Sequence, residues 1–89
     1  MITPDDDFGL PDDRARQLLA FAAAHPNLAR AEEGIRRELG LTPARYHQLL
    51  RRLIDTQQAL DIDPMLTHRL RRTRDEAQAE LARRLGTAH

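Results

Sequence analysis

The chain has 89 residues, contains no cysteine and has a formal net charge of zero at pH 7. This length predicts one small domain, and the lack of cysteine excludes disulfides and cysteine-based zinc sites. No apolar run approaches the roughly 20 residues needed to span a membrane, and no secretory segment is present, so a cytoplasmic protein is expected.

The zero net charge hides an uneven distribution along the chain. Residues 1–13 hold five aspartates and no base, whereas residues 14–89 hold fourteen arginines against nine acids. Lysine is absent, and arginine suits bidentate contacts with phosphates and guanine edges. A genome rich in G and C, which favours arginine codons throughout, is the plainer explanation of the same composition.

Two helices are predicted in the first half of the chain. Residues 1–10 have no helical periodicity and are interpreted as an acidic N-terminal tail. The first helix is predicted over about residues 11–24, because Asp12 and Asp13 complement the dipole at its start and Pro26 prevents its continuation. The second is predicted over about residues 28–39, with Asn27 as its cap. Its buried stripe consists of Leu28, Ala31, Ile35 and Leu39.

A tight turn and a strong start signal precede a third helix, predicted over about residues 43–56. Gly40 can adopt the left-handed conformation that ends a helix, Thr42 can cap the next helix, and Pro43 suits its first position. One face of the third helix is apolar and contains Tyr46, Leu49, Leu50, Leu53 and Ile54. The opposite face contains Ala44, Arg45, Gln48, Arg51, Arg52 and Asp55. This pattern is typical of a helix-turn-helix unit that offers its second helix to a DNA groove.

A longer fourth helix is predicted over about residues 64–85, with Asp63 as its cap, Pro64 at its first position and Gly86 closing it. Its apolar stripe consists of Leu66, Leu70, Ala77, Leu81 and Leu85. A strict heptad register fails, so we expect this helix to dock along the core with its last two turns projecting. The predicted fold is all-α: a three-helix helix-turn-helix core plus a longer C-terminal fourth helix, in one domain over residues 11–86.

Two segments, RYHQLLRRLID at 45–55 and DPMLTHRLRRTR at 63–74, carry a family resemblance. They resemble a small actinobacterial domain-of-unknown-function family, in which an R-Y-x-Q-x-L-x-x-L-I-D helix precedes D-P-x-L and an R-L-R-R-x-R run. The resemblance covers roughly residues 14–86. A mycobacterial member of that family is regarded as a nucleoid-associated DNA-binding protein, so the resemblance implies DNA binding and transfers no catalytic residues.

The predicted DNA-binding residues lie on the third helix and the start of the fourth. Gln48 suits an adenine edge, Arg45 or Arg51 suits guanine, and His47 adds charge at low pH. The full set is Thr42, Arg45, His47, Gln48, Arg51, Arg52, Arg69, Arg71, Arg72 and Arg74. The alternative is a solvated surface with ion pairs at helical spacing. Those pairs join Arg51 and Arg52 to Asp55, Arg71 to Asp75, and Arg72 to Glu76.

Tyr46 is expected in the core, with its hydroxyl emerging at the edge to meet a phosphate. The four histidines show no metal-ligand spacing, serine is absent, and there is no glycine-rich phosphate loop. We therefore expect no enzyme activity, no metal and no cofactor.

The leading hypothesis is a DNA-binding helix-turn-helix protein of the nucleoid, acting on duplex DNA as a transcriptional regulator or nucleoid-associated factor. An adaptor that binds RNA polymerase, a sigma factor or another regulator is the alternative, because the net charge is neutral. A phage repressor-like or antitoxin-like protein is a third hypothesis. A homodimer through residues 64–85 is a further expectation, since a single helix-turn-helix reads few base pairs.

Overall fold

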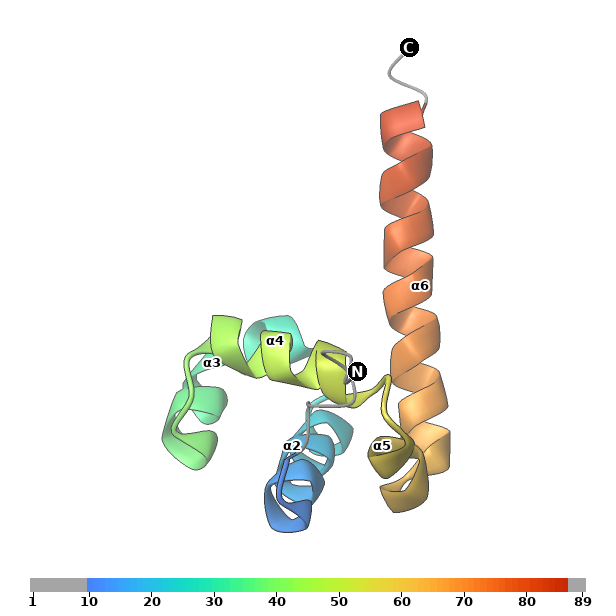
Figure 1. The fold of residues 1–89 in the computed structure, drawn as a ribbon. Helices are drawn as coiled ribbons and strands as arrows, with labels where there is room; N and C mark the ends of the chain where they lie inside the picture. Colours follow the sequence, from blue (N-terminus) through green and yellow to red (C-terminus); the bar gives the residue numbers. More distant parts are fainter. Residues whose placement is uncertain (1–9, 87–89) are drawn as a thin grey trace, which may run out of the picture.

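The computed structural model describes residues 10–86, and this part of the chain contains helices and no strand (Figure 1). The predicted all-α fold with a long C-terminal helix is confirmed. In chain order the elements are α2 (Asp12–Ala24), the 3-10 turn η1 (Leu28–Arg30), the short α3 (Glu32–Gly34), the π-helical η2 (Ile35–Leu39), α4 (Pro43–Leu53), α5 (Gln57–Ile62) and α6 (Pro64–Gly86).

The core lies where α2 packs against α4 and α5. Helix α2 buries five side chains on one side, namely Ala15, Leu18, Leu19, Phe21 and Ala22. Its first turn carries Asp12 and Asp13, as expected from the helix dipole. Leu10, the last residue of the predicted tail, also packs against the core. The rest of that tail, residues 1–9, lies outside the described residues.

The predicted second helix is wrong as one continuous element over residues 28–39. It is divided into η1, α3 and η2, and the side chain of Asn27 caps none of them. The backbone leaves helical geometry at Ala31, which has a φ of −103° and a ψ of 15°. Further along, Phe21 closely approaches Gly34, where an added Cβ would lie 3.3 Å from the ring. At the other end, the guanidinium of Arg14 donates to the carbonyl oxygen of Leu39 at 3.0 Å. This bond satisfies a carbonyl that the helix end leaves without an intrahelical partner.

The turn before α4 is as predicted. Gly40 has a φ of 66°, and the hydroxyl of Thr42 accepts a hydrogen bond from the backbone N–H of Arg45 at 3.1 Å. Tyr46 is fully buried, as expected. The expected position of its hydroxyl is wrong, because that hydroxyl donates to the carbonyl oxygen of Leu18 at 3.0 Å inside the core.

Helix α4 ends at Leu53, three residues earlier than predicted, and α5 was not predicted. Thr56 explains both differences. Its hydroxyl donates to the carbonyl oxygen of Leu53 at 2.6 Å and accepts from the N–H of Ala59 at 3.2 Å. One side chain therefore ends α4 and begins α5, which brings the buried Ala59 into the core.

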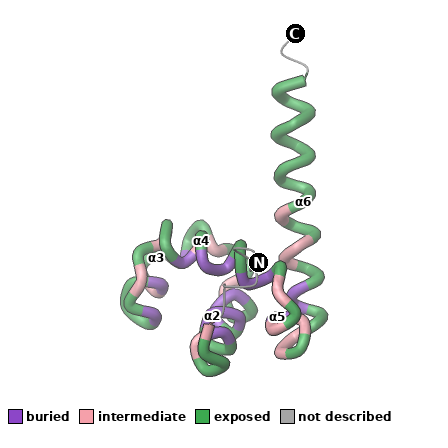
Figure 2. Tube along the Cα trace, in the orientation of Figure 1, coloured by how far each residue is buried: buried purple, intermediate pink, exposed green. Residues whose placement is uncertain are grey.

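Helix α6 begins as predicted and then leaves the core. The carboxylate of Asp63 accepts from the N–H of Leu66 at 3.1 Å, and the buried hydroxyl of Thr67 donates to the carbonyl oxygen of Ala59 at 3.0 Å. Leu66 is buried and Leu70 is partly buried, but every residue from 75 to 86 is exposed (Figure 2).

The projecting part of α6 is thus twelve residues, longer than the two turns expected. At 1.5 Å per residue it extends about 18 Å beyond the packed region. The physical reason is the shortness of α5, which supports only the first turns of α6. Gly86, the expected end of the helix, is still helical and is the last residue described. None of the helices between residues 10 and 86 is long and apolar enough to cross a lipid bilayer.

Candidate nucleic-acid interface

Helix α4 has two distinct faces, as the helical wheel predicted. The apolar face is buried in the core, with Tyr46, Leu49, Leu50 and Leu53. The opposite face is exposed and carries Ala44, Arg45, Gln48, Arg51 and Arg52. Between Pro43 and Leu53 the helix contains three arginines and no acid. We call these five exposed residues the α4 basic face.

The N-terminal end of the α4 basic face is held in place by local contacts. A guanidinium nitrogen of Arg45 donates to the side-chain oxygen of Gln48 at 2.7 Å. The backbone below this pair is fixed by the Thr42 cap. In helix-turn-helix proteins, residues at this end of the second helix contact base edges, and the pair occupies the corresponding end of α4.

His47 lies beside the α4 basic face and is half-buried. Its ring meets the ring of Tyr46 edge to face, with centroids 5.6 Å apart. It also lines an open hollow of about 330 Å³. The other residues that line this hollow are Ala44, Gln48, Arg51 and Arg52.

A second hollow, of about 360 Å³, lies between the end of α4 and the side of α6. It is lined by Arg51, Arg52, Asp55, Arg74 and Gln78. Because Arg51 and Arg52 line both hollows, the basic surface of α4 continues to α6. The contribution of Gln78 was missed, and its only sequence signal is its position one helical turn after Arg74.

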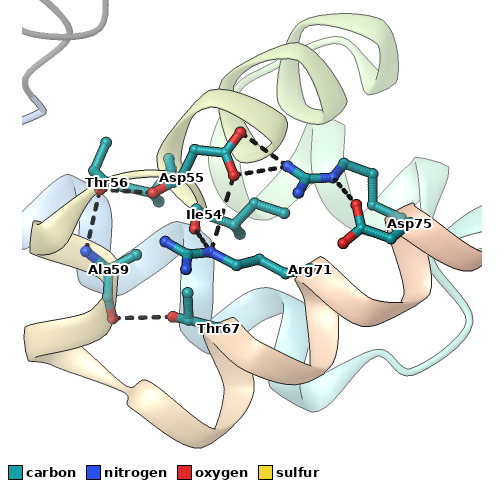
Figure 3. A network of polar contacts seen from close by, with 9 residues as sticks. Ile54, Asp55, Thr56, Ala59, Thr67, Arg71 and Asp75 are labelled. Atoms are coloured by element: carbon teal, nitrogen blue, oxygen red, sulfur yellow. Dashed lines mark hydrogen bonds and ion pairs between the residues drawn. The ribbon is translucent and has the colours of Figure 1, made fainter.

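Asp55 joins the end of α4 to α6 through two arginines (Figure 3). Both of its carboxylate oxygens accept from one guanidinium nitrogen of Arg74 at 2.8 Å, and Nε of Arg71 lies 3.9 Å away. Nε of Arg71 also donates to the carbonyl oxygen of Ile54, while Nε of Arg74 donates to Asp75 at 3.1 Å. These contacts link the start of α6 to the segment after α4.

This network changes the roles of two predicted DNA-binding residues. Arg71 and Arg74 both form hydrogen bonds within the chain. The hydrogen bond to Asp55 raises the pKa of Arg74 above its ordinary value. Asp55 takes these partners from α6. The alternative hypothesis paired it with Arg51 and Arg52, and of these two Arg52 has an interaction of its own in the described chain. Among residues 10–86, no hydrogen bond or ion pair engages the side chain of Arg51.

The remaining two predicted arginines lie apart from the α4 basic face. Arg69 is exposed and borders a different hollow, of about 450 Å³, between α6 and the end of α2. The other residues of this hollow are Ala22, His25, Pro26, Leu28, Leu70 and Thr73. Arg72 is exposed and lines neither hollow of the basic surface. In the described part of the chain, no three histidine, aspartate or glutamate side chains gather as a metal site.

Comparison with known proteins identifies the family. The chain belongs to a family described as Protein of unknown function (DUF3263), which matches residues 11–83. No curated protein and no solved structure matches the chain. The predicted membership in a family of unknown function is therefore confirmed, and DNA binding stays a prediction.

Proposed function

We propose that the protein binds double-stranded DNA through the α4 basic face and acts in the nucleoid as a transcriptional regulator or nucleoid-associated factor. The observation that carries this proposal is the exposed, acid-free side of α4, with three arginines and a glutamine. Acidic side chains would repel phosphates, so their absence from this helix is what a DNA-binding surface needs.

The packing of the apolar face of α4 against the core favours this role. Tyr46 and Leu53 are fully buried under the helix, and Thr42 caps its start. A helix held in this way keeps its outer side chains in a defined orientation. The major groove of B-DNA, about 12 Å wide, admits a helix in such an orientation.

We assign each side chain a role from its position on α4. Arg45 and Gln48 are at the N-terminal end of α4, where base edges are reached, and arginine pairs with guanine as glutamine does with adenine. Arg51 and Arg52 are one or two turns further along, beside the hollow shared with α6. There they contact the phosphates and set affinity independently of sequence.

The test is duplex binding by fluorescence anisotropy over a series of salt concentrations. Arg45→Ala is expected to weaken binding by about 1–3 kcal/mol, and Arg52→Ala to weaken it uniformly while reducing the salt slope by about one. Arg16→Ala is the matched control, because Arg16 is an exposed arginine of α2 and its loss removes the same charge. Equal losses in all three variants, or no binding by the intact chain at low salt, would overturn the proposal.

A protein-interaction adaptor is the second candidate, favoured by the projecting end of α6. Leu81 and Leu85 are 56% and 63% exposed there, which is unusual for large apolar side chains near each other on one helix. The salt series separates the two candidates, because binding to DNA weakens steeply with salt and apolar contact with a protein does not.

A further inference from the structure

Every residue of the free end of α6, residues 75–86, is exposed, and beyond Gln78, which lines the hollow at the end of α4, the helix projects away from the rest of the described chain (Figure 1). It carries three apolar residues at four-residue intervals: Ala77, Leu81 and Leu85. At 100° per residue these three lie within an arc of about 80°. They form a short apolar stripe, which we call the tip stripe, with Leu81 at its centre.

The charges beside the tip stripe are not symmetric. Glu80 and Arg84 lie on the same flank of the stripe, about 100° and 60° from Leu81. The opposite flank holds the uncharged Gln78 and Ala82. Within about 100° of Leu81, one flank therefore carries an acid and a base one helical turn apart, and the other carries no charge.

This distribution distinguishes two ways in which a second copy could cover the tip stripe. A twofold axis perpendicular to two helices makes them antiparallel and brings the same flank of each copy together. A twofold axis parallel to the helices brings opposite flanks together. Only the antiparallel arrangement places the acid of each copy opposite the base of the other.

We propose that residues 75–86 of α6 pair with the same segment of a second copy in antiparallel orientation, with the twofold axis close to Leu81. In this arrangement Glu80 of each copy faces Arg84 of the partner subunit, and Ala77 faces the partner's Leu85. Two leucines meet at the centre, and the small side chains of Ala77 and Ala82 allow close approach of the backbones. The proposal stands independently of DNA binding.

The contact is short, so the pairing depends on protein concentration. Stable interfaces bury about 800 Å² per partner, and a twelve-residue helix end offers less than this. Within one chain Glu80 already pairs with Arg83, so the charges add orientation more than affinity. We expect a reversible dimer.

The first test is sedimentation equilibrium over a concentration series. The intact chain is expected to increase in mean mass toward that of a dimer, and Leu81→Gln is expected to remain monomeric. Met65→Gln is the matched control, because Met65 is an apolar residue of the same helix and is 83% exposed outside the tip. A monomer at every concentration, or equal association of the Leu81→Gln variant, would contradict the proposal.

The second test reverses the charges. Glu80→Arg alone places two arginines opposite each other across the pair, and Arg84→Glu alone places two glutamates there. Each variant is expected to associate less than the intact chain, whereas an equal mixture of the two is expected to regain association as a heterodimer. Effects inside each chain are the same in monomer and dimer, so they cannot produce this recovery. A mixture no better than its components rules out the paired charges.

The third test determines the orientation and uses the absence of native cysteine. A mixture of Ala77→Cys and Leu85→Cys chains, oxidised gently, is expected to yield mainly the mixed disulfide dimer. A parallel pair would instead yield disulfides between identical variants. Mass spectrometry after digestion distinguishes the two products. A majority of disulfides between identical variants would contradict the antiparallel orientation.

Discussion

The two halves of α6 differ in how they are supported by the rest of the described chain. The first half packs against α5 and is held by buried Leu66 and Thr67 and by the contacts of Arg71 and Arg74. In the second half, residues 75–86, every residue is exposed. One continuous helix thus serves as part of the domain and then as an exposed extension. Helical sequence patterns alone do not distinguish these two situations, because both halves have apolar residues at helical spacing.

The largest expected difference between the halves comes from removing one leucine from each. Leu66→Ala is expected to destabilise the fold by about 2–5 kcal/mol, because it leaves a cavity in the core. Leu81→Ala, in the exposed half, is expected to change stability by less than about 0.5 kcal/mol. Urea denaturation followed by circular dichroism at low protein concentration measures both. Similar losses in the two variants would mean that the free end packs against the domain in solution.

The next effect concerns a buried hydroxyl. Thr67→Val keeps the shape of the side chain but removes the donor to the carbonyl oxygen of Ala59. A cost of about 0.5–1.5 kcal/mol is expected, since this carbonyl oxygen loses one of its two donors and keeps the N–H of Asp63 at 2.9 Å. Thr73→Val is the control, because Thr73 is exposed on the same helix and its substitution is expected to be neutral. A neutral result for Thr67→Val would show that its hydrogen bond does not anchor α6.

The packed region also predicts a dependence on alkaline pH. Burial raises the pKa of Tyr46 above its ordinary value, so the folded state keeps the phenol neutral while the unfolded chain ionises. The stabilising contribution is therefore complete below about pH 10 and is lost as the pH rises above it. The chain has one tyrosine, no cysteine and no lysine, so few other side chains titrate in this range.

Chemical denaturation at pH 8 and above about pH 10 tests this dependence. Tyr46→Phe is expected to cost about 1 kcal/mol at pH 8, from the lost hydrogen bond to Leu18, and to lose less stability than the intact chain on going to high pH. Parallel declines in the two proteins would assign the alkaline loss to other groups.

The smallest expected effect is that of removing the free end. A chain that stops after Glu76 lacks only exposed residues of the described region. Its free energy of unfolding at low concentration is expected to match that of the full chain within about 0.5 kcal/mol, while its helical signal falls. A lower free energy of unfolding would show that the extension stabilises the domain, and would contradict the difference between the two halves.

Local signals along the chain predicted much of the fold and of the candidate site. Gly40, Thr42 and Pro43 act within a few residues of one another, so their turn and cap could be read directly from the sequence. The same is true of Asp63 at the start of α6. The two-sided pattern of α4 correctly placed Tyr46 inside and the arginines outside, because helical periodicity determines which residues share a face.

Contacts between distant residues decided the rest. The close approach of Phe21 to Gly34, and the bond from Arg14 to Leu39, accompany the division of the predicted second helix. Whether Arg71 and Arg74 reach DNA or Asp55 depends on where α6 crosses the end of α4. The sequence by itself determined the starts of α4 and α6, their caps at Thr42 and Asp63, and the basic side of α4, since each depends on neighbours along the chain. Only the tertiary structure decided how much of α6 is supported, because that depends on the length of the helices packed beside it.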